Sequence, residues 1–470
     1  MKKTLILILG LIMILCSACG SLEEEEEMSI KDDVFDTYEK LRTDWKKADD
    51  IKDVRNAIVS FASQNDITYS RLSNDNLLLS LDATDEYTKA PVTILHCNIS
   101  MDHTSSKAQC AAIALAAIKN SKEHGAVKLF FTASDSTGYY GAGSLTKNQL
   151  KADNFISLDY CKKTKLYTGS AASVDYLLTQ KLHKVKTKGT VAYKISISGL
   201  EGGDSSDRTR KHGNPIKALG QLMNSCQSSG MAFEVAHLSG GSSAGTYPQN
   251  AEMTVTVDKN DEDKLLDKYD SMENDFEDSY RDNENNLKIS CTKCRVPGSS
   301  YSETVTANIM SFLYTVDDGV FTTTGSDGDS DSDEDGDPVA ITNIGYVKEF
   351  GKNTLQLGMK ARSIDQTMFK SMFEAFSSTA ELSDFKIKHA GKYPMWPFKE
   401  NSELADSYMV AAQQMDIEVE PEWTFAENEC ALFYNKRPDL DMICIGANIQ
   451  EGQELAESLV LYLQSLGGDN

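Results

Sequence analysis

A strand that ends in polar side chains is the first feature of this sequence that could support chemistry. Residues 94–103 read ILHCNISMDH, so an apolar run gives way to His96, Asn98, Ser100 and His103. A buried strand of this kind delivers polar groups to the edge of a sheet, where many α/β proteins hold their ligands. Asn98 and Ser100 stand two residues apart, and neither is a strong metal ligand or a base. The stretch has the form of a catalytic strand without the usual catalytic groups.

The elements around this stretch predict a layered α/β domain. Strands are predicted over 76–81, 92–99, 127–133 and 155–160. Residues 107–120 read KAQCAAIALAAIKN, a helix that is apolar all round and therefore belongs inside a core, against the sheet. Such alternation of strands and helices is typical of an α/β domain.

The pattern changes near residue 188 and changes back near 391. The middle segment predicts an α+β domain, with strands over 191–197, 231–238, 251–257, 286–292, 340–349 and 352–361 and helices over 214–226, 261–283, 302–313 and 365–376. After it come a helix at 402–415, strands near 428–434 and 441–446, and a helix at 452–466. We expect a first domain over 28–187 and 391–470, and an inserted domain over 188–390 with an Asp-rich loop at 324–338. An insertion of this kind leaves a cleft between two bodies, a common place for a ligand.

Six stretches, in order, resemble the motifs of the M20 metallopeptidases, most closely those of the aminoacyl-histidine (Xaa-His) dipeptidases. They are ILHCNISMD, FTASDSTGYYGAGSL, FISLDYCKKTKLYTGSA, SGLEGGDSS, ARSID and ENECALFYNKRPDLDMICIGANI. The resemblance covers nearly all of the chain after the N-terminal segment. It implies a two-domain, zinc-peptidase-like α/β fold with an inserted α+β lid domain.

The resemblance also implies where a pair of zinc ions would be held, and most of those positions are substituted. The first His ligand falls on Asn98, the bridging Asp on Lys107, a Glu ligand on Ser136 and the Asp ligand on Asp159. The Asp that supports the first His falls on Ser100, and no His occurs beyond His389 to supply the last ligand. Of these ligands only Asp159 is retained. The general-base Glu falls on Asp135, and the lid His that contacts substrate falls on Asp204.

A cation at position 107 changes the electrostatics of such a site. Two zinc ions need an anionic bridge between them, whereas Lys107 would repel them. A buried carboxylate without a partner is costly, so we hypothesise that Lys107 pairs with Asp159 or Asp135 and supplies the positive charge instead. No metal cofactor is expected, and zinc is expected only if the chain is an active enzyme.

Two other metal sites are weaker alternatives. His96 and His103 lie near the expected site and could bind zinc in a relocated geometry, although His96 is expected to point to the opposite face from Asn98 or into the core. Asp331–Gly336 matches the opening of a calcium loop, but the twelfth position is Thr342 rather than Glu. A solvated loop is the favoured interpretation of that Asp-rich segment.

The N-terminus predicts export and lipid anchoring. Lys2 and Lys3 precede an apolar run over 5–15 that is too short to span a bilayer, and Ser17-Ala18-Cys19 follows. This resembles a bacterial lipoprotein signal, with Cys16 where Leu is usual. Residues 1–19 would be the signal peptide, Cys19 the lipidated residue, and 20–27 an acidic spacer. The expected location is the bacterial cell envelope, outside the cytoplasm.

The net charge argues against one class of partner, and the cysteine content leaves disulfide pairing open. The formal net charge of −24 argues against nucleic acid, because phosphate contact needs a basic surface. Disulfides are possible in an exported chain, but the sequence alone cannot pair its cysteines. After the signal these are Cys97, Cys110, Cys161, Cys226, Cys291, Cys294, Cys430 and Cys444.

The leading functional prediction is an exported, lipid-anchored, M20 dipeptidase-like protein that does not hydrolyse peptides. It would bind a small peptide, an amino-acid derivative or a protein partner. One alternative is an active metal-dependent dipeptidase with altered ligands, and another is a surface interaction scaffold. Turnover with added metal would distinguish the enzyme. Ligand-dependent stabilisation without turnover would distinguish the binder, and neither effect would be seen with the scaffold.

Overall fold

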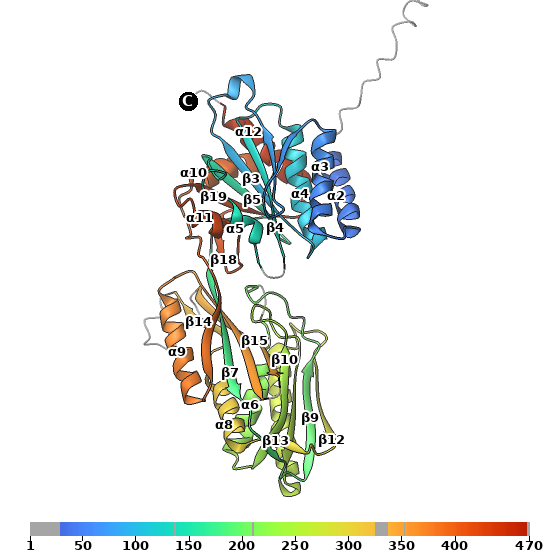
Figure 1. Cartoon of the computed structure of the whole chain (residues 1–470), viewed down its shortest axis with the longest axis vertical. Helices are drawn as coiled ribbons and strands as arrows, with labels where there is room; N and C mark the ends of the chain where they lie inside the picture. The colour runs from blue at the N-terminus through green and yellow to red at the C-terminus, as the bar shows by residue number, and fades with distance from the viewer. Residues whose placement is uncertain (1–28, 136–137, 209–210, 325–336, 352, 468–470) are drawn as a thin grey trace, which may run out of the picture.

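The computed structural model describes residues 29–135, 138–208, 211–324, 337–351 and 353–467. It has two bodies, one built on an eight-stranded sheet and one on a nine-stranded sheet (Figure 1). The predicted signal peptide, the predicted acidic spacer and residues 325–336 of the Asp-rich loop lie outside the described residues. Within the described ranges, no helix combines the length and the apolar character that a membrane span requires.

The first body contains the eight-stranded sheet, in the order β1-β2-β4-β3-β5-β19-β6-β18. Strands β4, β3, β5 and β19 are parallel neighbours, whereas β1 and β2 pair in antiparallel fashion at one edge. Its elements are α2 (Ile30–Lys46), α3 (Ile51–Gln64), β1 (Thr68–Arg71), β2 (Leu77–Leu81), a 3-10 turn (Asp85–Tyr87), β3 (Thr93–Ser100), α4 (Thr104–Asn120), β4 (Val127–Ser134), α5 (Tyr140–Ser144), β5 (Asn154–Tyr160), β6 (Lys165–Ser170), α10 (Glu403–Gln413), β18 (Pro421–Thr424), α11 (Cys430–Tyr434), β19 (Asp441–Ala447) and α12 (Gly452–Ser465).

The second body contains the nine-stranded antiparallel sheet, in the order β12-β9-β11-β10-β15-β16-β7-β17, with β14 paired to β15. Its elements are β7 (Ala172–Lys181), β8 (Lys184–Lys186), β9 (Val191–Ser198), α6 (Pro215–Ser228), β10 (Phe233–Gly241), β11 (Ala251–Val257), a 3-10 turn (Lys259–Asp261), α7 (Glu262–Tyr280), β12 (Lys288–Cys294), β13 (Ser299–Tyr301), α8 (Glu303–Thr315), β14 (Gly319–Thr323), β15 (Pro338–Phe350), β16 (Thr354–Ser363), α9 (Met368–Leu382) and β17 (Lys386–Tyr393). The prediction of an α/β body followed by an α+β body is confirmed.

The chain crosses between the two bodies earlier than the sequence pattern suggested. The sequence pattern predicts the boundary between 187 and 188, but β7 (Ala172–Lys181) already pairs with β16 and β17 in the second sheet. The crossing therefore lies at residue 171, between the last residue of β6 and the first of β7. The reason is that the residues of β7 do not themselves indicate a sheet, and only its pairing partners show to which sheet it belongs.

The core of the first body explains the alanine-rich helix. Residues 108 and 110–118 of α4 are buried, and α4 contacts β3, β5, α2 and α12. The small side chains of α4 let neighbouring elements pack closely against it on every side. A helix with a polar face could not be buried all round in this way. This packing fixes the first turn of α4, and thus Lys107, over the ends of the central strands.

Gly141 lets α5 lie directly against β4. A β-carbon at Gly141 would overlap the backbone of Ala133 and the Asn76 side chain. Asn76 itself links the two elements, because its Nδ2 donates to the Gly141 carbonyl (3.0 Å) and its Oδ1 accepts from the Ala133 amide (3.0 Å). Gly143, two residues further on, has open space at the same position, with no atom within 4 Å.

We therefore predict that Gly141→Ala lowers the free energy of unfolding by about 2 kcal/mol, because the added methyl group must displace backbone in a packed site. Gly143→Ala is the matched control, and it should leave stability unchanged or slightly raised, since alanine is the better helix former. Urea unfolding of both variants measures the difference. Equal stability of the two variants would contradict the packing argument.

Candidate functional site

The ends of the central strands bring the predicted site residues to one edge of the sheet. The register aligns Asn98 with Thr132, Ser100 with Ser134, and Asp159 with Gly446. Because β3, β4, β5 and β19 are parallel, their carboxyl ends open at the same place. Asn98, Lys107 and Asp159 thus face a common site, as the motif order implied.

Lys107 and Asp159 form an ion pair at the centre of this site. Lys107 Nζ donates to Asp159 Oδ1 at 2.9 Å, and the same oxygen accepts from the Tyr160 amide at 2.9 Å. Burial by itself lowers the pKa of Lys107, but the attraction of Asp159 outweighs it and holds that pKa above the ordinary value. Burial also raises the pKa of Asp159, but Lys107 outweighs this effect, so that pKa lies below its usual range. The pair predicted from charge is therefore present, with Asp159 as the partner of Lys107.

A buried hydrogen-bonded cluster lies beside this pair. His96 Nδ1 contacts Ser157 Oγ and His96 Nε2 contacts Thr132 Oγ1, each at 2.8 Å, while Thr132 Oγ1 donates to Glu429 Oε1 at 2.7 Å. All four side chains are buried. Burial lowers the pKa of His96 to about 3, so the imidazole is neutral at pH 7. Burial raises the pKa of Glu429 to about 7, against the opposing charge of Lys107 and the bond from Thr132.

His96 lies in the core, and on the same face of β3 as Asn98. The alternative that it points to the opposite face is wrong, because residues two apart on a strand share a face. Asn98 Nδ2 donates to the Thr132 carbonyl at 3.2 Å, and Ser134 Oγ donates to Asn98 Oδ1 at 2.9 Å. Asn98 is therefore a structural link between β3 and β4, with its amide engaged by neighbours.

The general-base position, Asp135, and the lid position, Asp204, are both exposed. Asp135 is exposed and its backbone pairs with Gly138 in an isolated bridge, and Ser136 and Cys19 lie outside the described residues. Asp204 is also exposed, and its Oδ1 accepts from Arg362 Nη2 at 2.9 Å. The Arg362 side chain is 2% exposed and Asp204 is 63% exposed, so an accessible carboxylate covers a buried cation. The side chain at the lid position, Asp204, is thus already paired with Arg362 of the same chain.

The donor set does not fit a pair of zinc ions. The positions implied for ligands hold an amide engaged with β4, a charged ammonium group and one carboxylate that is already paired. His103, the residue before α4, has a left-handed backbone (φ 56°) and is exposed, whereas His96 is buried. Throughout the described ranges, no three His, Cys, Asp or Glu side chains are grouped closely enough to hold a metal ion.

A cavity of about 400 Å³ lies where the two bodies meet, next to this site. Tyr139 and Leu432 line it from the first body, and Asp175, Lys360 and Tyr393 line it from the second. Lys360 forms an ion pair with Glu427 and lies 3.4 Å from Asp175 Oδ1. The arrangement offers aromatic rings and both signs of charge to a small polar ligand.

Sequence reasoning missed Glu429, Thr132 and Ser157. Glu429 stands in the stretch ENECALF, which was used for the resemblance but given no role. The only signal was an acidic residue within an apolar segment, and such a residue is rarely buried without a partner. Its partner Thr132 is 297 residues away, so the contact has no local signature.

Comparisons with known proteins identify relatives with the same architecture. No family model matches the chain. The chain is 22% identical over 353 residues to the cytosol non-specific dipeptidase of Escherichia coli (strain K12), covering 73% of this chain and 69% of that protein. The crystal structure of aminoacylhistidine dipeptidase from Vibrio alginolyticus superposes with a TM-score of 0.72 at 18% identity, over 94% of this chain and 99% of that one. A tripeptidase from Staphylococcus aureus superposes with a TM-score of 0.50 at 11% identity, over 94% and 99%.

These similarities agree with the order of the motifs along the sequence. The superpositions show the fold, and the sequence match extends over 73% of this chain. The predicted resemblance is therefore confirmed at this level: the chain is similar in sequence to a dipeptidase and has the two-domain fold of aminoacylhistidine dipeptidase.

Proposed function

We propose that this protein is an exported, lipid-anchored relative of the M20 dipeptidases that binds a small peptide or amino-acid derivative without hydrolysing it. The observation that supports this most strongly is the contact of Lys107 Nζ with Asp159 Oδ1 at 2.9 Å. An ammonium group occupies the position where the family implies an anionic bridge between two zinc ions. The cavity of about 400 Å³ between the two bodies is the proposed ligand site.

The chemistry of peptide hydrolysis explains why this substitution matters. A metal pair polarises the peptide oxygen and lowers the pKa of the attacking water toward 7. Lys107 can offer a positive charge to an oxygen, but it cannot bind and acidify a water as a metal does. Without a metal, a water next to Asp135, at the general-base position, would keep its ordinary pKa. The protein would retain the shape of the enzyme without its nucleophile.

Metal analysis and a dipeptide panel test this proposal together. We expect the zinc content of the full chain to equal the buffer blank, and no release of amino acids with added zinc, cobalt or manganese. The E. coli cytosol non-specific dipeptidase is the positive control in both assays. Some dipeptides should raise the melting temperature without being cleaved, since a ligand selective for the folded state stabilises it. About two zinc ions per chain, with chelator-sensitive cleavage, would establish the active dipeptidase instead.

Lipid anchoring through Cys19 has a separate test. The apolar run over 5–15 and the small residues before Cys19 support it. Metabolic labelling with palmitate should mark the protein, and Cys19→Ala should abolish both the label and recovery in the membrane fraction. A labelled Cys19→Ala variant would place the lipid elsewhere.

A further inference from the structure

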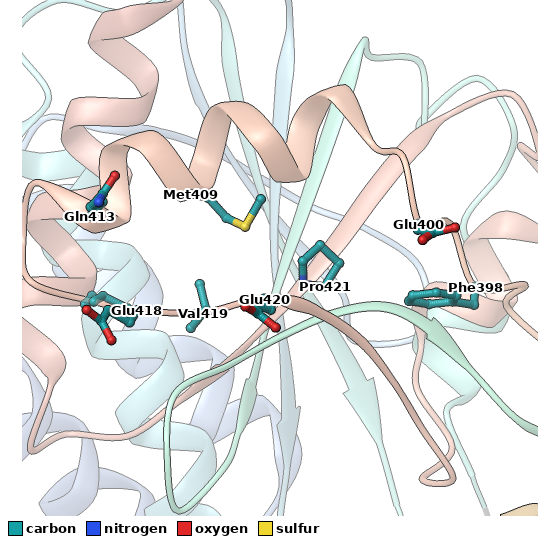
Figure 2. Close-up of a pocket in the computed structure, with 9 residues that line it drawn as sticks. Phe398, Glu400, Met409, Gln413, Glu418, Val419, Glu420 and Pro421 are labelled. Atoms are coloured by element: carbon teal, nitrogen blue, oxygen red, sulfur yellow. The ribbon is translucent and has the colours of Figure 1, made fainter. Parts of the chain in front are cut away.

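A second, larger hollow lies on the first body. It has a volume of about 890 Å³ and is formed by α10, by the segment that leads into β18 and by residues 398 and 400. Figure 2 shows Met409 pointing from α10 toward Val419, with Glu418 at one end of the groove, Glu420 in the middle, and Glu400 beside Phe398 at the other end. A smaller hollow of about 240 Å³ shares the wall formed by 418–421. We call the larger hollow, with Phe398, Glu400, Met409, Gln413, Ile417, Glu418, Val419, Glu420 and Pro421, the α10 groove.

The acidic side chains of the α10 groove are not neutralised by the protein. Glu400, Glu418 and Glu420 are exposed, and in the described part of the chain none of them has a hydrogen bond or an ion pair. The nearby lysines are already committed, because Lys165 pairs with Glu422 at 2.8 Å and Lys399 with Asp441 at 2.9 Å. No Lys or Arg lines the groove itself. Three carboxylates on one hollow produce a negative potential that favours a cationic ligand.

The spacing of these carboxylates determines the kind of cation. Within the described residues, they are not grouped closely enough to hold a single metal ion. Between them lie apolar side chains, namely Phe398, Met409, Val419 and Pro421. A ligand that matches both features is extended, with positive charges separated by apolar spacers. A second copy of the chain, with its net charge of −24, and any polyanion are poor matches.

We propose that the α10 groove binds a linear aliphatic polyamine. Its ammonium groups would form charge-assisted hydrogen bonds with Glu418, Glu420 and Glu400, and its methylene chain would lie on Met409, Val419 and Phe398. This site is separate from the cavity between the two bodies, so it does not depend on whether that cavity binds peptides. It also differs in charge, since the cavity between the bodies contains both lysine and carboxylate groups.

Isothermal titration calorimetry of the full chain with spermine at low ionic strength tests the proposal. We expect one spermine per chain and a Kd that rises with added salt. Glu418→Gln combined with Glu420→Gln should raise the Kd at least about tenfold, because two charged acceptors are lost. The matched control is Glu374→Gln with Glu381→Gln, two exposed carboxylates on α9 of the other body, and it should leave the Kd unchanged. Phe398→Ala should raise the Kd about threefold through loss of its contact with the ligand.

Three results would overturn this proposal. The first is an equal effect of the α10-groove pair and the α9 control pair on the Kd for spermine. The second is magnesium chloride competing as well as spermine at matched ionic strength, which would indicate general screening. The third is a trilysine peptide binding as tightly as spermine, which would indicate a protein partner. Melting temperatures of the Gln variants close to that of the unmodified protein confirm that the fold is intact.

Discussion

Replacing Lys107 with methionine is expected to lower the free energy of unfolding by about 3 kcal/mol. The substitution leaves the Asp159 carboxylate without its cation, in a site that already contains the buried Glu429. Removing one partner of a buried pair costs roughly 3–5 kcal/mol. The lower end of that range applies because the Asp159 side chain is 42% exposed and solvent screens part of the charge. Urea unfolding at pH 7 measures the loss.

Two further variants separate the ion pair from a general effect of removing a lysine. Lys165→Met removes one partner of a pair of similar length, Lys165–Glu422 at 2.8 Å, in which the side chains are 43% and 38% exposed. We expect a cost below about 1 kcal/mol there. The double variant Lys107→Met with Asp159→Asn should recover most of the stability, since no charge is left unpaired. A single variant as stable as the unmodified protein, or a double variant no better than the single, would contradict the role assigned to the pair.

The contribution of this pair should also depend on pH. The pKa of Asp159 is lowered in the folded protein, so its contribution is present above the ordinary pKa of the carboxyl group and is lost as the pH falls through the folded value. The difference between the unmodified protein and Lys107→Met should therefore shrink in acid.

The second large effect is expected from Glu429, whose carboxyl group should make stability fall as the pH rises. Its folded pKa of about 7 lies above the ordinary value of 4.5, so between these values the folded state holds a proton that the unfolded state has released. The stabilisation is complete below about pH 4.5 and is lost as the pH rises through about 7. At about 1.4 kcal/mol per pH unit, the loss amounts to roughly 3 kcal/mol.

Glu429→Gln isolates this effect, because glutamine resembles the protonated acid and can still accept the hydrogen bond from Thr132. The stability of the unmodified protein relative to Glu429→Gln should be greater at pH 5 than at pH 8. His96 acts in the opposite direction, since its pKa of about 3 makes stability rise with pH up to about 6.5, but it is present in both proteins. Glu374→Gln, on the exposed surface of α9, is the control for which no pH-dependent difference is expected. A difference between Glu429→Gln and the unmodified protein that stays constant with pH would contradict the assignment.

Together these predictions describe a site whose charged side chains are neutralised by other side chains of the protein. Lys107 neutralises Asp159 where the family implies metals, and Asp204 covers Arg362 where it implies contact with substrate. This internal neutralisation is the physical basis for proposing binding without hydrolysis.

Features that depend on local pattern could be predicted from the residues alone. The alternation of strands and helices predicted the first body, and the apolar run of Ala and Ile predicted that α4 lies inside the core. The order of six motifs predicted the fold, and the residue types at 98, 107 and 159 predicted an ion pair in place of a ligand set. Each of these inferences needs only neighbouring residues or a known order of motifs.

The tertiary structure alone decided which distant groups meet. The sheet to which β7 belongs depends on its partners β16 and β17, and the raised pKa of Glu429 depends on its burial, beside a Thr132 that is 297 residues away. The same holds for Asp204 and Arg362, which are 158 residues apart. Burial and pairing set the charge state of such groups, and neither property can be predicted from the residues next to them in the sequence. The sequence could therefore predict that Lys107 needs an anion, whereas the packing of parallel strands determined that the anion is Asp159.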